Sequence, residues 1–327
     1  MPPISALRLN MTNTADPAAD HGARYRAALD MAAYADSHGM TAVSCEEHHL
    51  AATGWLPSPL VMAAAVAART SRIRISVNAL LIPLYDPVKL AEDIAVLDNL
   101  ADGRFSFVAG MGYRPEEYEA LGRDWGTRAR QMDECLEVLL AAWSDGPFRY
   151  RGRMIEVTPK PTTKPHPLMF VGGMSAAAAR RAARFGLPFS PPMPMPEIEA
   201  IYTESLAENG RQGFVMRPSA GNTITHLSVD PDGDWRRYGQ YFRTEANEYS
   251  SWRRAGVPRP HEQYAATNED LRRLGTVEIL TAAELLAQCR AGRGEIAINP
   301  LMGGLPLEAG WESLRILGSE VLPALAR

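Results

Sequence analysis

The sequence has few cysteines, and they lie far apart. Its 327 residues include only three, Cys45, Cys135 and Cys289. Three scattered thiols form neither a disulfide framework nor the paired ligands of a structural zinc site. The sequence also lacks a His-Glu-x-x-His pattern, so we expect no metal centre, and we expect a protein of the reducing cytoplasm.

Long hydrophobic runs and blocks of one charge are absent as well. No apolar stretch approaches the roughly 20 residues of a membrane-spanning helix, and the start, Met1–Ile4, lacks the basic and apolar segments of a signal peptide. The net charge is −4, without a cluster of Lys and Arg. We therefore expect a small-molecule substrate and no nucleic acid or membrane partner.

Apolar residues are plentiful, and they are arranged in two alternating patterns. Hydrophobic residues make up 46% of the chain and charged residues 22%, which is typical of a globular protein. Short apolar runs predict strands at residues 4–11, 40–45, 73–81, 104–109, 168–171, 187–190, 222–228 and 295–299. Longer amphipathic runs predict helices at residues 24–38, 58–70, 87–100, 127–143, 176–184, 197–209 and 307–325. We expect the last helix to be interrupted near Gly310 and ended by Pro323.

Eight strands, most of them followed by a helix, predict a (β/α)₈ barrel, an α/β fold in which residues 1–327 form a single domain. Two segments fall outside the pattern, and we expect them to be insertions at the carboxyl face of the barrel. Residues 146–166 contain a hairpin around Arg151-Gly152, and residues 230–276 are rich in Trp, Tyr, Arg and Pro and are partly helical. No Gly-x-Gly-x-x-Gly motif follows the first strand, which argues against a Rossmann fold.

The stretch Gly172-Gly173-Met174-Ser175 connects a predicted buried strand to an alanine-rich helix. Glycine lets a ligand approach the backbone, Ser175 is a natural N-cap, and the amides and dipole of a helix start favour an anion. The turn is therefore a candidate phosphate cradle. A strand-to-helix turn that needs glycine for its geometry alone is the alternative.

A second polar cluster, Glu46-Glu47-His48-His49, follows the second predicted strand, on the face where barrel enzymes place their active sites. Histidine exchanges protons near neutral pH, and a neighbouring carboxylate such as that of Glu47 can orient the ring and raise its basicity. His48 is the candidate acid or base. For His49 a polar side chain of the core or rim is the simpler interpretation.

Further candidates lie after the third and fourth strands. Asn78 offers its amide either to the edge of a heteroaromatic ring or to a buried backbone group. Gly110 and Met111 begin a segment that either lets a planar ring or a phosphate approach the backbone, or simply forms a turn. Arg128 and Arg130 open the next helix, where a guanidinium can reach the same anion as the glycine turn or lie on the helix surface.

In the order and spacing of its motifs, the chain resembles the bacterial luciferase-like family of flavin-dependent barrel enzymes. The resemblance runs nearly end to end. The matching pieces are Glu47-His48-His49, Ile82–Val88 followed by Leu90–Asp93, Leu97-Asp98 before Gly103–Phe105, Gly172-Gly173-x-Ser175, Trp311–Leu314 and Val321–Pro323.

The resemblance implies a barrel that binds reduced FMN or, as in many relatives, the deazaflavin coenzyme F-420. It implies that the Gly172–Ser175 turn and Arg130 hold the phosphate, and that His48 is the acid/base residue. It also implies a non-prolyl cis peptide at Asn78-Ala79, behind the flavin ring, which adds Ala79 to the expected cofactor contacts. We further expect a homodimer.

Two features depart from the luciferase pattern. Where luciferases have a cysteine and an arginine after the fourth strand, this chain has Gly110 and Met111, so light emission is not expected and one phosphate contact is missing. Segment 230–276, on the substrate side, matches no family motif, but its aromatic residues recur roughly every three to four positions: Trp235, Tyr238, Tyr241, Phe242, Tyr249 and Trp252. A helix there carries an aromatic face that either packs on the barrel or lines the substrate side as a mobile cover.

The leading hypothesis is a two-component monooxygenase. It takes FMNH₂ from a separate flavin reductase, since the chain has no nicotinamide-binding fingerprint, and uses oxygen on a small apolar substrate. The protein excludes water, and His48 moves protons. The alternatives are an F-420-dependent oxidoreductase that transfers hydride, and a non-catalytic flavin-binding protein, against which the presence of His48 argues.

Overall fold

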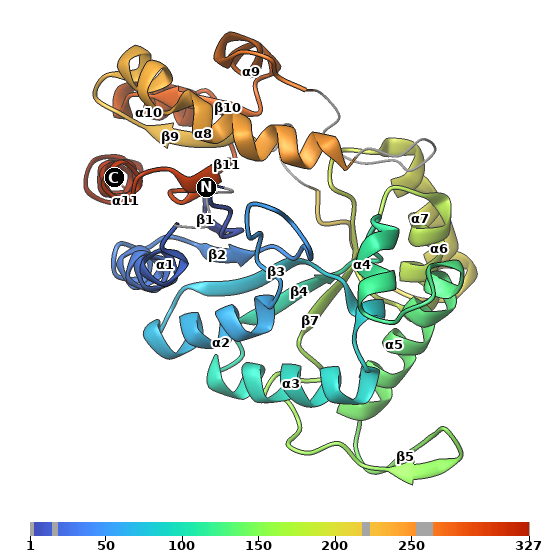
Figure 1. The fold of residues 1–327 in the computed structure, drawn as a ribbon. Helices are drawn as coiled ribbons and strands as arrows, with labels where there is room; N and C mark the ends of the chain where they lie inside the picture. The colour runs from blue at the N-terminus through green and yellow to red at the C-terminus, as the bar shows by residue number, and fades with distance from the viewer. Residues whose placement is uncertain (1–2, 15–18, 218–222, 253–263, 327) are drawn as a thin grey trace. The chain divides into compact units, whose positions relative to one another are not determined.

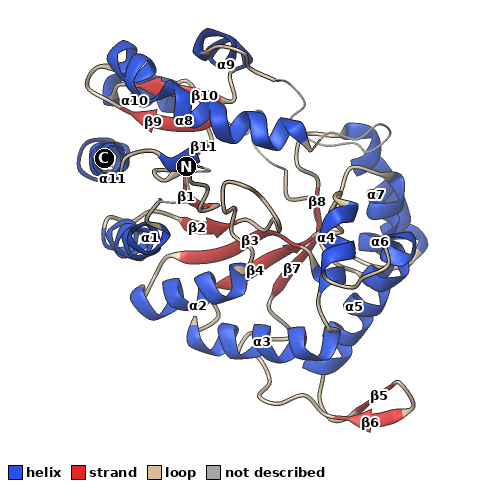
Figure 2. Ribbon diagram, in the orientation of Figure 1, coloured by secondary structure: helices blue, strands red, loops and turns tan. Residues whose placement is uncertain are grey.

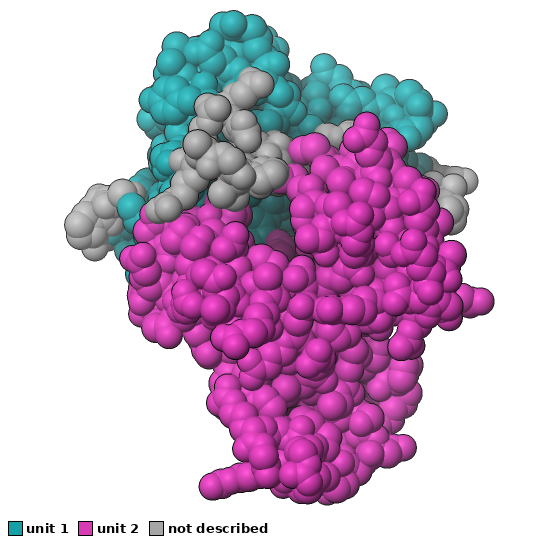
Figure 3. Space-filling model, turned by 90° about the vertical axis from the view of Figure 1, so that its right-hand side faces the viewer, with its two compact units in different colours: residues 1–57, 69–74, 219–327 teal, residues 58–68, 75–218 magenta. Residues whose placement is uncertain are grey.

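The structure, a computed structural model, describes residues 3–14, 19–217, 223–252 and 264–326. The chain forms two compact units, which Figure 3 shows in separate colours. Unit 1 comprises residues 1–57, 69–74 and 219–327, and unit 2 comprises residues 58–68 and 75–218. Unit 1 therefore joins the two ends of the chain, whereas unit 2 holds most of its middle.

Unit 1 is built on five parallel strands (Figure 1). In order of pairing they are β10 (Val277–Leu280), β9 (Ile224–Leu227), β11 (Glu295–Ile298), β1 (Ile4–Leu9) and β2 (Ala42–Cys45). The register places Ala6 between Ala297 and Ala42. Because the strands are parallel, the residues that follow β11, β1 and β2 emerge at the same edge.

The helices of unit 1 are α1 (His21–Ser37), α8 (Pro231–Ser251), α9 (Asn268–Leu274), α10 (Ala282–Arg290), α11 (Leu307–Ile316) and α12 (Leu322–Leu325), with a 3₁₀ turn at Met302–Gly304. Four helices in the described part of unit 1, α1, α8, α9 and α10, begin at residues whose side chains accept a hydrogen bond from a first-turn amide. Asp20 accepts a hydrogen bond from the Ala23 amide at the start of α1. Capping boxes at Thr267 and Thr281 start α9 and α10.

Unit 2 contains four parallel strands, which Figure 2 draws in red with the other strands. Their order is β3 (Arg74–Leu80, in this unit from Ile75 on), β4 (Phe105–Ala109), β7 (Leu168–Gly172) and β8 (Phe189–Ser190). The helices are α2 (Pro59–Arg69, in this unit up to Ala68), α3 (Pro87–Leu100), α4 (Pro115–Ala120), α5 (Arg128–Trp143), α6 (Ala176–Phe185) and α7 (Pro196–Glu208), with 3₁₀ turns at Ile82–Leu84 and Trp125–Thr127.

The predicted hairpin at residues 146–166 is confirmed as a separate two-stranded sheet. Strands β5 (Phe148–Tyr150) and β6 (Arg153–Ile155) are antiparallel. Between them, Arg151 has φ 46° and Gly152 has φ 78°. Two left-handed residues in succession are what a tight two-residue hairpin turn requires.

The predicted α/β class is confirmed, and most helices and strands are found within a few residues of their expected bounds. The partly helical character of segment 230–276 is also confirmed, by α8 and α9; residues 253–263 lie outside the described residues. Strand β10 was not predicted, because its four residues include Glu278 and show no clear apolar run. Glu278 accepts a hydrogen bond from Thr225 of the paired strand and forms an ion pair with Arg293.

The prediction for the closing helix was wrong in two respects. Helix α11 continues through Gly310, and the irregular stretch is a π-helical turn at Leu317–Val321. Gly310 is required by packing, because a Cβ there would lie 2.0 Å from the carbonyl oxygen of Pro300. Pro323 does not end the chain's last helix but lies in the first turn of α12, where its missing amide needs no partner within the helix.

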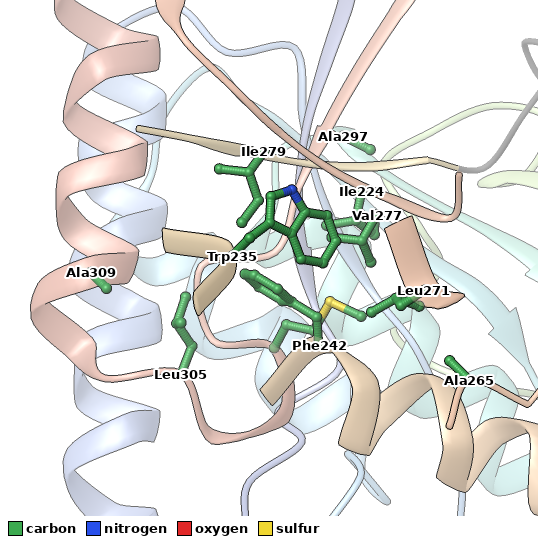
Figure 4. Packing of buried hydrophobic residues seen from close by; sticks show 11 residues of the cluster. Ile224, Trp235, Phe242, Ala265, Leu271, Val277, Ile279, Ala297, Leu305 and Ala309 are labelled. Atoms are coloured by element: carbon green, nitrogen blue, oxygen red, sulfur yellow. The ribbon is translucent and has the colours of Figure 1, made fainter. Parts of the chain in front are cut away.

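An apolar cluster in unit 1 fastens α8 to the strands beside it (Figure 4). Phe242 is fully buried, and its ring centre lies 6.3 Å from that of Trp235, one of its neighbours in this cluster. The other buried members are Ile224, Ala265, Leu271, Val277, Ile279, Ala297, Met302, Leu305 and Ala309. The first part of α8 is therefore a core element of unit 1.

Replacing Phe242 with alanine should leave a large cavity in this cluster. We expect Phe242→Ala to lower the free energy of unfolding by about 3–5 kcal/mol, the usual cost of removing a buried phenyl ring. Urea denaturation measures the change, with Val229→Ala as the control, since Val229 is 78% exposed. A loss no larger than that of the control would contradict the assignment of Phe242 to the core.

Candidate active site

The predicted cofactor residues lie at one edge of three neighbouring strands of unit 2. Asn78 and Ala79 are in β3, Gly110 and Met111 follow β4, and Gly172 ends β7. Strand β4 pairs with β3 on one side and β7 on the other, all in parallel. Their carboxyl ends therefore meet at the same edge, where the sequence placed the site.

The Gly172–Ser175 turn has the local structure expected of an anion site. Ser175 is the N-cap of α6, and its hydroxyl accepts a hydrogen bond from the Ala178 amide (3.2 Å). Helix geometry gives the amides of Ala176 and Ala177 no acceptor within α6, so these two can bind an anion. The turn is thus built to present backbone donors.

Packing alone already requires both glycines of this turn. A Cβ on Gly172 would lie 2.7 Å from Cγ1 of Val108, and one on Gly173 would lie 2.5 Å from the Cβ of Ala178. Gly173 also has φ +150°, which side chains rarely adopt. The glycines therefore shape the turn, and any phosphate contact depends on the amides and on a nearby cation.

Of the two candidate arginines, Arg128 is already engaged. Its guanidinium donates to the carbonyl of Trp125 (2.9 Å) and lies 3.9 Å from the centre of that ring. Arg130 is exposed in the first turn of α5. Helix α6 is joined to the same turn, since Arg181 donates to the Ala129 carbonyl and pairs with Asp133. Arg130 is therefore the better candidate for a mobile anion contact.

The cis peptide predicted at Asn78-Ala79 is confirmed. The pairing between β3 and β4 shifts at this point, between Asn78 and Leu80. Gly110 fits beside the shifted segment, because a Cβ on it would lie only 2.7 Å from the Cβ of Ala79. Met111 is held by its carbonyl, which accepts a hydrogen bond from the Tyr118 hydroxyl.

The candidate catalytic residues belong to unit 1, in the loop after β2. Glu47 is buried, and its Oε1 lies 3.0 Å from Nε2 of His49, so its partner in this pair is the second histidine of the motif. The His48 amide donates to the Leu56 carbonyl (3.2 Å). The second contact closes the loop between residues 48 and 56, and the His48 side chain is buried.

Among the described residues, three aromatic rings surround His48. Their centres lie at 5.1 Å for Trp55, 5.9 Å for Tyr249 and 4.7 Å for Trp252 from that of the imidazole. Trp55 comes from the same loop, whereas Tyr249 belongs to α8 and Trp252 is its C-cap. The aromatic face of segment 230–276 is thus divided: Trp235 and Phe242 pack in the apolar cluster, and Tyr249 and Trp252 contact His48.

Sequence reasoning did not single out Trp55, nor the two glutamates that hold the end of α8. Glu248 accepts hydrogen bonds from the amide and hydroxyl of Thr53. Glu245 is buried and accepts from Asn10 (2.8 Å) and Thr12. The available signal was their position: Glu248 and Tyr249 follow Glu245 by three and four residues, and Trp252 follows Glu248 by four, so all four lie on one face of α8 and its C-cap.

Neither a metal-binding cluster nor a membrane-spanning helix is found among the described residues. Among them, no group of three or more His, Cys, Asp or Glu side chains is arranged to hold a metal ion. Within the same part of the chain, no helix is long and apolar enough to cross a membrane.

Comparison with known proteins identifies the family. The sequence profile of the luciferase-like monooxygenases matches residues 8–287. The 4-hydroxyprotoasukamycin monooxygenase of Streptomyces nodosus subsp. asukaensis is 26% identical over 305 residues, which cover 84% of this chain and 80% of that protein. The uncharacterized protein y4vJ of Sinorhizobium fredii is 30% identical over 166 residues, 49% of this chain and 47% of the relative.

Solved structures show the same fold. Monooxygenase RslO1 from Streptomyces bottropensis has a TM-score of 0.74 at 24% identity, covering 98% of this chain and 99% of that one. The oxygenating constituent of 3,6-diketocamphane monooxygenase from Pseudomonas putida, in complex with FMN, has a TM-score of 0.69 at 19% identity. The match covers 99% of this chain and 98% of that one. An F420-dependent secondary alcohol dehydrogenase has a TM-score of 0.65 at 18% identity, and the match covers 99% of each chain.

The chain belongs to the luciferase-like monooxygenase family, because the family profile covers most of its length. It is an oxidoreductase, and the predicted (β/α)₈ class is confirmed by the solved structures it resembles.

Arg130 should discriminate between phosphorylated and unphosphorylated flavin. We expect Arg130→Met to lower the affinity for FMN by about 10- to 100-fold, the effect of losing one charge-assisted hydrogen bond. The affinity for riboflavin should remain nearly unchanged. Flavin fluorescence titration measures both affinities. Arg128→Met is the matched control, since Arg128 is held by Trp125. Equal loss of both ligands in Arg130→Met would assign Arg130 a structural role.

Proposed function

We propose that the protein is a flavin-dependent monooxygenase that uses reduced FMN and oxygen on a small, apolar organic substrate. The observation that carries the proposal is the edge of β3, β4 and β7. There a cis peptide at Asn78-Ala79, a close approach by Gly110 and the amides that start α6 occur together. The family match and the likeness to a monooxygenase component in complex with FMN support this assignment.

The residues at this edge fit a flavin mononucleotide. The free amides at the start of α6, with the guanidinium of Arg130, suit the phosphate, because oriented donors and a charge satisfy an anion together. Met174, between Gly173 and Ser175, is half-buried and can cover the ribityl chain. Asn78 is exposed, its Nδ2 donates to the Ser76 hydroxyl (3.3 Å), and its amide can meet a polar ring edge.

Bound FMN in its reduced form supplies the electrons that activate oxygen. His48 would give or take the proton that accompanies oxygen transfer, and its aromatic neighbours Trp55, Tyr249 and Trp252 keep water from the imidazole. Glu47 holds His49 and so stabilises the loop that carries His48.

We propose that a separate flavin reductase delivers the reduced cofactor, and that the enzyme acts in the cytoplasm as a homodimer. The absence of a nicotinamide fingerprint in the sequence supports a separate reductase. The solved relative described as an oxygenating constituent supports the same division of labour.

The second candidate is an F-420-dependent oxidoreductase that transfers hydride. The likeness to an F420-dependent alcohol dehydrogenase favours it, with a TM-score of 0.65 over 99% of the chain. The two functions differ in the cofactor and in the need for oxygen, so a direct titration separates them.

Titration with reduced cofactors tests the proposal. We expect the purified protein to bind FMNH₂ in preference to reduced F-420 under anaerobic conditions, and to change the absorbance time course when the complex is mixed with oxygen, relative to free FMNH₂. Stopped-flow spectroscopy measures both. Preference for reduced F-420 without an effect of oxygen would favour the hydride-transfer enzyme, and binding without any chemistry would favour a non-catalytic flavin protein.

His48 should matter for turnover and not for cofactor binding. We expect His48→Ala to slow turnover about 10²–10⁴-fold, the usual contribution of a positioned acid or base, at unchanged FMN affinity. His49→Gln is the matched control, because glutamine keeps a donor for Glu47; we expect it to change turnover only a few-fold. The assignment fails if His48→Ala is fully active with saturating cofactor.

A further inference from the structure

Glu245 stands out among the ionisable groups of unit 1, because its carboxyl is buried inside a network of uncharged donors. Its Oε1 accepts a hydrogen bond from Nδ2 of Asn10 (2.8 Å). Its Oε2 contacts the Thr12 hydroxyl and lies 3.2 Å from the amide nitrogen of Gly303. The donors lie just beyond β1 and in the turn that follows β11, so one side chain of α8 joins the ends of both strands.

The network continues through Asn10 and Thr12. Oδ1 of Asn10 accepts from Nδ2 of Asn299, and it lies 3.2 Å from the Thr12 hydroxyl. The Gly303 amide is closer to the Thr12 hydroxyl (2.8 Å) than to Glu245. Every polar atom of Glu245 is therefore paired without a direct ion pair, an arrangement that accepts a neutral carboxylic acid.

The electrostatic surroundings favour the protonated form. Burial raises the pKa of Glu245 to about 7, and Glu46 adds to the rise, while hydrogen bonds from Thr12 and Asn10 and the charge of Arg8 act against it. Arg8 is committed to Glu46, to which its Nε donates (2.5 Å). Arg24, another charged group near Glu245, donates to the carbonyls of Leu301 and Leu305.

The end of α8 beyond Glu245 carries the residues that meet His48. Tyr249 lies one helical turn after Glu245, and Trp252 follows as the C-cap. Glu248, between them, holds Thr53 of the His48 loop. Because an α-helix is rigid over one or two turns, the hydrogen bonds that fix Glu245 also determine where the rings of Tyr249 and Trp252 lie.

We propose that Glu245 is a positioning residue whose neutral carboxyl fastens the end of α8 to the ends of β1 and β11 and so holds Tyr249 and Trp252 against His48. The helix contacts stand by themselves; their relevance to catalysis rests on the proposed function. In the neutral form Oε2 donates its proton to the Thr12 hydroxyl, which donates in turn to Oδ1 of Asn10. The hydroxyl still accepts the Gly303 amide, so the network is complete.

The pH dependence follows from the sign of the shift. The pKa of Glu245 lies above the ordinary 4.5 of a glutamate, so the folded state holds this proton more tightly than the unfolded chain. The resulting stabilisation is complete at acid pH, and it is lost as the pH rises through about 7. Above that pH the buried carboxyl is ionised, and the docked end of α8 is favoured less.

Hydrogen exchange on the full chain, without flavin, tests the proposal. We expect protection factors of residues 245–252, corrected for intrinsic exchange, to fall between pH 6 and 8.5, at most about tenfold per pH unit above the pKa. Glu245→Gln should remove this dependence and keep the protection high, because its amide donates to Thr12 as the protonated acid does. Glu248→Gln is the matched control one turn away. It should lower the protection factors equally at every pH and leave their dependence on pH unchanged.

A second variant keeps the test decisive if Glu245→Gln folds poorly. Glu46→Gln removes a charge that adds to the rise in the pKa of Glu245, so it should move the midpoint of the transition to lower pH. A wild-type protein with no pH dependence in this segment, or a Glu245→Gln variant with the wild-type slope, would overturn the proposal. If the exchange results are as expected but the protein binds no flavin, the role of Glu245 in positioning α8 stands and the proposed function fails.

Discussion

The carboxyl ends of parallel strands leave backbone groups that must find partners beyond the sheet, and this need shapes the site residues of both units. In unit 1, the Asn10 carbonyl accepts a hydrogen bond from the Leu56 amide (2.8 Å), which ties the His48 loop to the end of β1. In unit 2, the Leu80 carbonyl accepts from the Gly110 amide (2.8 Å), which brings Gly110 beside Ala79. The same bonds that satisfy the strand ends therefore position the residues available for chemistry.

Glycine has a different role at the candidate phosphate site than its motif suggests. The open backbone at Gly172 and Gly173 is filled by Val108 and Ala178 of the protein itself. The turn is thus specified by packing, and the affinity for an anion comes from the amides that the helix leaves free and from a guanidinium such as that of Arg130. A motif can be required by the fold and still present a binding site.

Helix α8 shows how one amphipathic segment serves two purposes. Its first turns place Trp235 and Phe242 in the apolar cluster, and its last turn places Tyr249 beside His48. Glu245 lies where the change occurs, and it takes the polar edge of the strands as its partner. The sequence predicted a single aromatic face, with packing and substrate contact as alternatives. The division arises because the helix runs from the apolar cluster to that polar edge.

The sequence by itself determined the α/β class, most helices and strands, the hairpin at Arg151-Gly152 and the motifs that define the family, since periodicity and turn chemistry act over a few residues. The cis peptide at Asn78-Ala79 was predictable only through the family resemblance. Strand β10 was missed, because a four-residue strand containing Glu278 leaves little local signal. The partners of Glu245 were decided by tertiary structure alone: Asn10 is 235 residues away in the sequence, and a glutamate on an amphipathic helix has the same local pattern whether it faces water or a strand end.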